Sequence, residues 1–306
     1  MKSVFVSILN FNGAKNTLEC LASLKKINSK DFNLTILVVD NASSEKLSLK
    51  SETTGKIKVQ VIENKENLGF SGGNNIGIKQ ALKNNADYVL ILNNDTFVAP
   101  DFLNQLMKVA EKNQNAGILV PKIYFAPEFE YHKERYSEKE KGKVFWYAGG
   151  KMDWKNVIGS NRGVDEVDKG QFEKEEETEM ATGCCMLIRR EVLERIGNFD
   201  ENYFLYYEDA DLTMRAKKNG FKIIYVPSSI VWHKNAGSTG GSGSALQDYY
   251  ITRNRLLFGS KYASIRAKLA LFRESLVLFF KGRKWQKCGV VDFYLEKFGK
   301  GSYKSE

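Results

Sequence analysis

Short apolar segments alternate with segments of helical periodicity through the first 120 residues, and this alternation constrains the fold more than any other feature. The apolar runs have the length of strands and lie at Val4–Leu9, Leu34–Val39, Ile57–Ile62, Tyr88–Leu92 and Gly117–Val120. Helical spacing is found at Thr17–Ile27, at Gly72–Lys83 and from Pro100 to about Asn113. Buried strands that alternate with helices predict an α/β fold with a mostly parallel central sheet and helices on both of its faces.

Polar residues follow three of these expected strands. Asn10 ends the first strand, Asp40 ends the second, and Asn93–Asp95 follow the strand at Tyr88–Leu92. In open α/β sheets, ligands bind at the carboxyl ends of the strands. We therefore expect a ligand site at this edge of the sheet.

The cysteines and the N-terminus indicate where the protein works. The four cysteines lack the spacing of a metal site or of a disulfide framework, which indicates buried thiols in a reducing compartment. The apolar run near the N-terminus, Val4–Leu9, is too short for a signal peptide or a membrane span. We expect a cytoplasmic protein, and its 306 residues allow one large domain or one domain with an appendage.

Two polar residues at strand ends are candidate metal ligands. Asp95 is a single aspartate that could bind a divalent cation together with a diphosphate, and oxygen ligands suit Mg²⁺ or Mn²⁺. The alternative is an ordinary turn rich in Asn and Asp. His233 ends a later apolar segment, and a histidine in such a place is either a ligand or a hydrogen-bonded structural residue.

A glycine-rich turn, Asn64–Asn75, follows one strand and opens a helix. It contains Asn67, Gly72 and Gly73, and its glycines allow a close approach of the backbone. The amides at a helix N-terminus suit a phosphate or sugar hydroxyls. The turn lacks the spacing of a dinucleotide fingerprint or a Walker loop, so a purely structural turn is the alternative.

A cluster of carboxylates lies beside aromatic residues at 206–211. Glu208 and Asp209 directly precede a segment of helical pattern, Leu212–Asn219. Acidic residues commonly cap a helix start, because the partial positive charge there favours anions. The neighbouring aromatic side chains could instead form a partly dry pocket in which one carboxylate serves as a general base.

The second half of the chain predicts three further features. Phe221–Trp232 has two short strand signals separated by Pro227, and Gln247–Lys281 has a helical pattern. Between them, the Gly/Ser-rich stretch 237–244 is interpreted either as a lid over the site or as a disordered connector.

Seven short motifs occur together in one order, and their combination resembles family 2 glycosyltransferases of the GT-A fold, most closely the bacterial rhamnosyltransferase-type members. The motifs are Val6–Gly13, Val38–Asn41, Asn67–Phe70, Leu92–Asp95, Gly183–Met186, Phe199–Glu201 and Glu208–Leu212. The resemblance covers roughly residues 1–255 and implies a GT-A, Rossmann-like nucleotide-sugar-binding domain.

The resemblance also implies roles for the residues that would hold the donor. Asn10 would line the nucleotide pocket, and Asp40 would accept a hydrogen bond from a pyrimidine base. Asn94 stands where the family often has the first aspartate of its Asp-X-Asp motif. Arg253 resembles an arginine that reaches the donor diphosphate or an acceptor phosphate.

Three further positions would carry the chemistry. Asp95 matches the metal-binding aspartate, and His233 matches a position that completes the metal site in some members. Asp209 aligns with the catalytic base, with Glu208 as the alternative. A cation stabilises charge on the leaving group, and a base on the opposite face takes the acceptor proton, which gives inversion.

The activity that follows is metal-dependent, inverting transfer of a sugar from a nucleotide-diphosphate donor to a glycan or lipid-linked glycan in the assembly of cell-surface polysaccharide. The expected donor is dTDP-rhamnose or a UDP-sugar. One alternative is a noncatalytic nucleotide- or carbohydrate-binding module on the same fold. Another is a sugar nucleotidyltransferase, which would need a glycine- and basic-rich loop that Asn10–Gly13 does not provide.

The C-terminal part of the chain is basic. Residues 251–306 carry 13 Lys and Arg against 4 Asp and Glu, a net charge of +9 that equals the net charge of the whole chain. We expect a catalytic domain over 1–248 and an amphipathic helical extension over 249–306. Its residues 261–298 would either pack on the domain or bind the anionic inner face of a membrane. A homodimer through this extension is a further alternative, and no motif predicts nucleic-acid binding.

Overall fold

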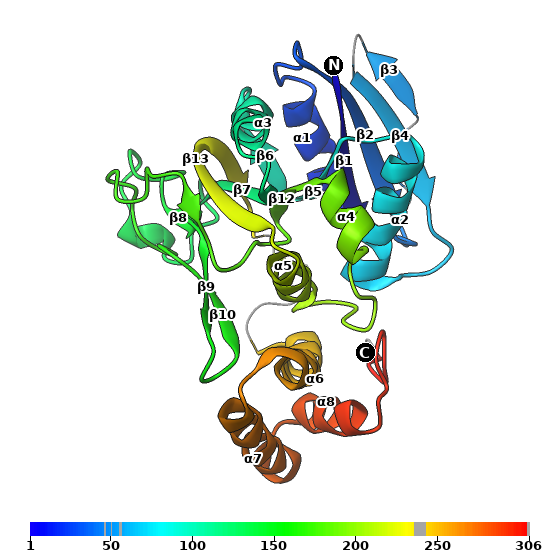
Figure 1. Ribbon diagram of the computed structural model, residues 1–306, viewed down its shortest axis with the longest axis vertical. Coiled ribbons are helices and arrows are strands. Elements are labelled where there is room, and N and C mark those ends of the chain that lie inside the picture. The colour runs from blue at the N-terminus through cyan, green and yellow to red at the C-terminus, as the bar shows by residue number, and fades with distance from the viewer. Residues whose placement is uncertain (46, 50, 55–56, 236–242, 305–306) are drawn as a thin grey trace.

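The computed structural model describes residues 1–45, 47–49, 51–54, 57–235 and 243–304, and its centre is a large mixed sheet (Figure 1). The strands are β1 Lys2–Asn10, β2 Phe32–Asp40, β3 Glu52–Thr54, β4 Ile57–Glu63, β5 Tyr88–Asn93, β6 Thr96–Val98, β7 Ala116–Phe125, β8 Phe145–Tyr147, β9 Gly150–Asp153, β10 Ile158–Asn161, β11 Glu176–Glu177, β12 Cys185–Arg189 and β13 Lys222–His233. In the sheet their order is β11-β13-β7-β12-β5-β1-β2-β4-β3, with β6 on β13 and β8 on β7, while β9 and β10 form a separate hairpin.

The N-terminal half of the sheet is parallel, as predicted, apart from the short edge strand β3, which is antiparallel to β4. Strands β4, β2, β1 and β5 run in one direction, and their register places Asn10 opposite Asp40 and Leu9 opposite Asn93. Their apolar runs are continuous because both faces of the sheet are covered. The predicted clustering of polar residues at one edge of the sheet is therefore confirmed for Asn10, Asp40 and Asn93.

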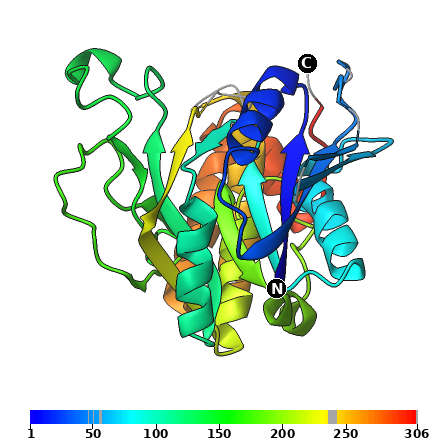
Figure 2. The same cartoon turned by 90° about the horizontal axis from the view of Figure 1, so that it is seen from above.

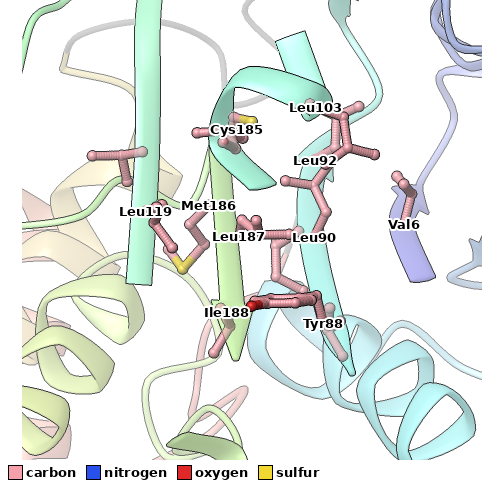
Figure 3. Close-up of a cluster of buried hydrophobic side chains, with 14 of the residues drawn as sticks. Val6, Tyr88, Leu90, Leu92, Leu103, Leu119, Cys185, Met186, Leu187 and Ile188 are labelled. Atoms are coloured by element: carbon pink, nitrogen blue, oxygen red, sulfur yellow. The ribbon is translucent and has the colours of Figure 1, made fainter. Parts of the chain in front are cut away.

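The other half of the sheet changes direction at β12. This strand lies antiparallel between β5 and β7, and β13 then pairs with β7 in parallel. Figure 3 shows the apolar side chains that pack around this junction, including Leu90 of β5, Leu119 of β7 and Leu187 of β12. The prediction of two separate strands within Phe221–Trp232 is wrong, because β13 is one strand whose register shifts between Val226 and Ile230. Pro227 lies within this irregularity, where a missing amide hydrogen is tolerated.

Helices cover both faces of the sheet (Figure 1). They are α1 Ala14–Leu24, α2 Gly69–Lys83, α3 Phe102–Lys112, α4 Arg190–Ile196 and α5 Glu208–Lys218, with a short 3₁₀ turn at Lys133–Arg135. Successive side chains of β1 point to opposite faces of the sheet. Asn10 accepts a hydrogen bond from Thr17 of α1 on one face, while Leu9 packs against Gly73 of α2 on the other. The segments between β7 and β12 project to the side of the sheet away from the N-terminal strands (Figure 2).

Three further helices form a layer of their own beyond α5 (Figure 1). They are α6 Ala245–Tyr262, α7 Ile265–Lys281 and α8 Lys284–Tyr294. The predicted boundary at residue 248 falls inside α6, and the helical segment is interrupted at Ala263–Ser264, where the Ser264 hydroxyl accepts from the Ala267 amide and caps α7. Within the described residues, each helix is too short or too polar to cross a membrane.

Candidate functional site

The carboxyl ends of β1 and β2 form the first part of the site. Asn10 is fully buried, its Oδ1 accepts from the Thr17 hydroxyl at 2.8 Å, and its Nδ2 donates to Ser43 Oγ at 3.1 Å. On the next strand, Asp40 Oδ1 accepts from the Ser43 amide at 3.0 Å. Asn10 and Asp40 are thus held together through Ser43, and Asn10 contributes chiefly by fixing the shape of this edge.

Asn94 lies next to this pair, and its amide points back into the protein. Its Nδ2 donates to Thr17 Oγ1 at 3.0 Å and lies 3.4 Å from the Gly13 carbonyl oxygen. A carboxylate at this position could donate to neither group, which explains why an amide fits here. These contacts hold the Asn94 side chain against α1, directly before Asp95.

Asp95 and His233 are brought together, as the sequence predicts. His233 Nε2 lies 3.1 Å from Asp95 Oδ1, and both side chains are largely buried. The antiparallel pairing of β6 with β13 sets this contact, because its last step places His233 opposite Thr96. The Trp146 ring packs edge-on against the imidazole at 4.6 Å, and His233 Nδ1 is buried without a hydrogen bond to any described residue.

The Asp95–His233 pair fits the geometry of two metal ligands. Two ligands at right angles around an ion that is about 2.1 Å from each lie about 3 Å apart, close to the 3.1 Å observed. Among the described residues there is no group of three or more His, Cys, Asp and Glu that could hold a metal. A cation at this pair would therefore complete its coordination with water and substrate oxygens, as Mg²⁺ commonly does.

Glu208 and Asp209 begin helix α5. Asp209 Oδ2 accepts from the Gly183 amide at 3.0 Å and its Oδ1 accepts from the Ala210 amide at 2.8 Å. Burial raises the pKa of Asp209 above its ordinary value. Glu208 is more deeply buried, its Oε2 has no hydrogen-bond partner among the described residues, and burial together with the Asp209 charge raises its pKa well above the ordinary value.

Gly183 and Cys184, just before β12, connect the strand end near Asp95 with Asp209. The Cys184 carbonyl accepts from the Asn93 amide at 2.9 Å, two residues before Asp95. The adjacent Gly183 donates its amide to Asp209. A Cβ on Gly183 would lie 3.0 Å from the Phe70 ring, so the segment passes close to its neighbours. The role of Gly183 was missed from the sequence, although its motif was recognised.

The loop that leads to Asp209 has a strained backbone. Phe204, Tyr206 and Tyr207 have φ of 61°, 68° and 72°, a region that costs a side chain such as these about 1–2 kcal/mol per residue. Asn254 of α6 stabilises this loop, because its Nδ2 lies within 2.9 Å of three backbone carbonyl oxygens. These belong to Tyr203, Leu205 and Tyr206. Asn254 was also missed, since no local pattern connects it to a loop fifty residues earlier.

Arg253 does not lie where the resemblance implies, and the expectation that it reaches a phosphate is corrected. Its side chain is fully buried. The guanidinium donates to the carbonyls of Asn202 at 3.1 Å, Tyr203 at 3.2 Å and Lys297 at 3.3 Å. It faces the loop before Asp209 because it shares that side of α6 with Tyr249 and Tyr250, over whose rings it packs. Its contacts tie this loop to the C-terminal residues.

The glycine-rich turn also differs from expectation. The Phe70 and Ser71 amides, at the start of α2, both donate to the Phe204 carbonyl, at 2.7 and 3.2 Å. The Asn67 side chain accepts from the Gly69 amide at 2.8 Å. These amides are therefore already used within the protein, and nucleotide-sugar binding by Asn67, Gly72 and Gly73 stays a prediction.

Gly72 and Gly73 have a packing role. A Cβ at Gly72 would lie 2.8 Å from Leu68, and one at Gly73 would lie 2.4 Å from Leu9. The lack of a side chain at Gly73 lets α2 approach β1 closely, whereas Gly72 leaves room for Leu68 at the start of α2. The predicted lid over 237–244 lies largely outside the described residues, at 236–242.

Comparison with known proteins adds three findings. The model of the family described as Glycosyl transferase family 2 matches residues 3–197. The low-salt glycan biosynthesis hexosyltransferase Agl10 of Haloferax volcanii is 28% identical over 222 residues, 72% of this chain and 66% of that protein. The N-acetylglucosaminyl-diphospho-decaprenol L-rhamnosyltransferase of Mycobacterium tuberculosis is 28% identical over 219 residues, 68% of each chain. The match thus spans about two thirds of these curated relatives.

A solved structure gives the fold. The structure of GalNAc-T7 with UDP, GalNAc and Mn²⁺ superimposes with a TM-score of 0.59 at 18% identity, over 97% of this chain and 57% of that chain. At this identity the likeness concerns the fold alone, and it confirms the predicted α/β architecture with a helix-flanked central sheet.

Proposed function

The chain belongs to glycosyl transferase family 2, and we propose that it transfers a sugar, with inversion at the anomeric carbon, from a nucleotide-diphosphate donor to a hydroxyl of a glycan. The observation that carries this proposal is that one short segment lies between a candidate metal-binding pair and a candidate base. The Asp95–His233 pair lies at one end, and Asp209 lies at the other, joined through Cys184 and Gly183.

Asp209 is the proposed base. Its pKa is raised by burial, which makes its carboxylate a stronger proton acceptor than an exposed aspartate. Its two backbone hydrogen bonds hold the carboxylate in one orientation. Glu208 is less suited to the role, because it is buried beneath the start of α5 and holds its own proton more tightly.

Asp95 and His233 are the proposed ligands of Mg²⁺ or Mn²⁺. A divalent cation bound there would supply charge stabilisation for the leaving diphosphate. Asp40 is the proposed contact of the nucleotide base, since within the described residues its Oδ2 accepts no hydrogen bond and remains an acceptor at the strand edge. Asn10 and Asn94 shape this pocket from behind.

We propose dTDP-rhamnose or a UDP-sugar as the donor and a lipid-linked glycan as the acceptor. The Mycobacterium tuberculosis relative is named for an L-rhamnosyl group and a decaprenol-linked acceptor, which supports a rhamnosyl donor and a lipid-linked acceptor. Such an acceptor would bring the enzyme to the inner face of the cell membrane as a peripheral protein in polysaccharide assembly.

The test begins with thermal shifts in the presence of UDP-, dTDP- and GDP-sugars, each with Mg²⁺ or Mn²⁺. We expect one nucleotide class to stabilise the protein in a cation-dependent way, and the Asp209→Asn variant to bind that donor but fail to transfer its sugar. If no nucleotide stabilises the chain, the proposal fails. If donor binds but neither wild type nor variant transfers or hydrolyses it, a noncatalytic binding module is the correct reading.

A further inference from the structure

Helix α7 has two apolar faces, and only one of them packs on the protein. On the packed face, Ala267, Leu271 and Ser275 recur every four residues and are buried. Leu271 fits against α6 because Gly259 leaves room, since a Cβ there would lie 2.2 Å from Leu271 Cδ1. The Ser275 and Tyr294 hydroxyls, 2.8 Å apart, join α7 to α8. These contacts fix the orientation of the helix.

The opposite face carries a stripe of large apolar side chains that point to solvent. We call them the α7 stripe, and they are Ile265, Leu269, Phe272, Leu276, Phe279 and Phe280. Their exposed fractions run from 44% to 79%. At 100° per residue they fall within an arc of about 100°, the width of an amphipathic face. Exposed apolar stripes of this size mark a binding surface rather than ordinary surface.

Positive charges border the α7 stripe on both sides. Lys268 lies along one edge, and Arg266 and Arg273 lie along the other, according to the same helical spacing. Lys281 and Lys284 follow at the C-terminal end of the helix, while Arg283 between them is ion-paired with Asp248. Figure 1 shows α7 at the outer end of the molecule, away from the sheet, and the stripe residues are exposed within the described chain.

We propose that the α7 stripe docks on an anionic lipid surface, with the helix lying in the membrane interface. An apolar face bordered by lysine and arginine matches a bilayer whose head groups are negative and whose interior is apolar. A second copy of the chain fits less well, because it would bring the same positive borders together. The helix is not long and apolar enough to span the bilayer. This inference goes beyond sugar transfer and stands without it.

The experiment is flotation of the full chain with vesicles of phosphatidylcholine alone or mixed with phosphatidylglycerol. We expect binding to the mixed vesicles that weakens with salt. We also expect a loss of at least about tenfold in the Phe272→Ser/Leu276→Ser/Phe280→Ser variant, which removes three exposed apolar groups that docking would bury. Val277→Ser is the matched control. Val277 is 56% exposed on the same helix but lies outside the stripe, so this variant should bind like wild type.

A second part of the experiment tests the role of the positive charges and the oligomeric state. Lys268→Glu/Arg273→Glu should abolish the preference for phosphatidylglycerol without a change in thermal stability, since neither residue is in the packed face. Equal flotation of the triple variant and Val277→Ser would overturn the proposal. So would a wild-type dimer in sedimentation that the triple variant dissociates, with no lipid binding. Transfer to a water-soluble acceptor should be unchanged in all three variants, which separates this test from that of the proposed function.

Discussion

The two halves of the candidate site are held by different means. On the donor side, Asn10, Asp40 and Asn94 are fixed by strand register and by hydrogen bonds to Thr17 of α1 and to Ser43. On the base side, Asp209 follows a loop with left-handed residues at Phe204, Tyr206 and Tyr207, and this loop is held by α6. The donor side thus needs the sheet and helix α1, which carries Thr17, whereas the base side also needs helices that come later in the chain.

The Asp209→Asn variant should give the largest effect, because it removes the base while leaving the donor side intact. An amide cannot accept the acceptor proton, so kcat should fall by about 10²–10⁴-fold, while the donor-dependent thermal shift should remain. In wild type, the acid limb of the kcat profile should lie above the ordinary pKa of an aspartate, because burial raises that of Asp209, and activity should be lost as pH falls through it. A variant that loses donor binding to the same extent as activity would contradict the assignment.

Asn254→Ala tests whether α6 supports the base side alone. It removes the side-chain amide that lies within 2.9 Å of the three loop carbonyls, and each buried hydrogen bond contributes about 1 kcal/mol. We expect a destabilisation of about 2–3 kcal/mol and, because a small misplacement of a catalytic group is costly, a fall in kcat of about 10–100-fold with little change in donor KM.

Leu257→Ala is the matched control for Asn254. Leu257 is buried in the second hydrophobic cluster on the same helix, and its truncation should cost about 2–5 kcal/mol. Its kcat, measured well below the unfolding temperature, should stay close to that of wild type. If both variants lose activity in proportion to their stability, α6 merely contributes to folding and the contrast between the halves disappears.

The sequence predicted the strand ends of the donor side well, but the glycine-rich turn, Arg253 and the base side only in part, for a physical reason. Strand ends such as Asn10 and Asp40 are readable because a continuous apolar run followed by a polar residue has few other interpretations. The Phe204 carbonyl caps α2 and Asn254 holds the loop of Tyr206, but both are contacts between distant segments that leave no local pattern. Arg253 was misplaced for the same reason, since its motif says nothing about which way α6 is turned.

Glu208→Gln probes the buried carboxyl beneath the base. The folded protein binds the Glu208 proton more tightly than the unfolded chain, whose glutamate pKa is about 4.3. Unfolding therefore releases a proton above that pH, and wild-type stability should fall, by at most about 1.4 kcal/mol per pH unit, as pH rises from about 4 through the folded pKa. The variant should lose this slope in unfolding free energy measured by denaturant titration. Parallel curves for the two proteins would show that Glu208 ionises normally.

The smallest expected effect belongs to Asn94→Asp on the donor side. The new carboxylate would lose the hydrogen bond to Thr17 Oγ1 and face the Gly13 carbonyl, so we expect a loss of about 1 kcal/mol in unfolding free energy. The same charge would stand beside Asp95 and should tighten Mn²⁺ binding about fivefold, the effect of one more charge in a solvated site. Thermal shifts over a Mn²⁺ titration with a nucleoside diphosphate measure both. Asn113→Asp, on the exposed end of α3, is the control that adds a charge elsewhere, and equal Mn²⁺ midpoints for the two variants would mean that Asn94 does not adjoin the cation.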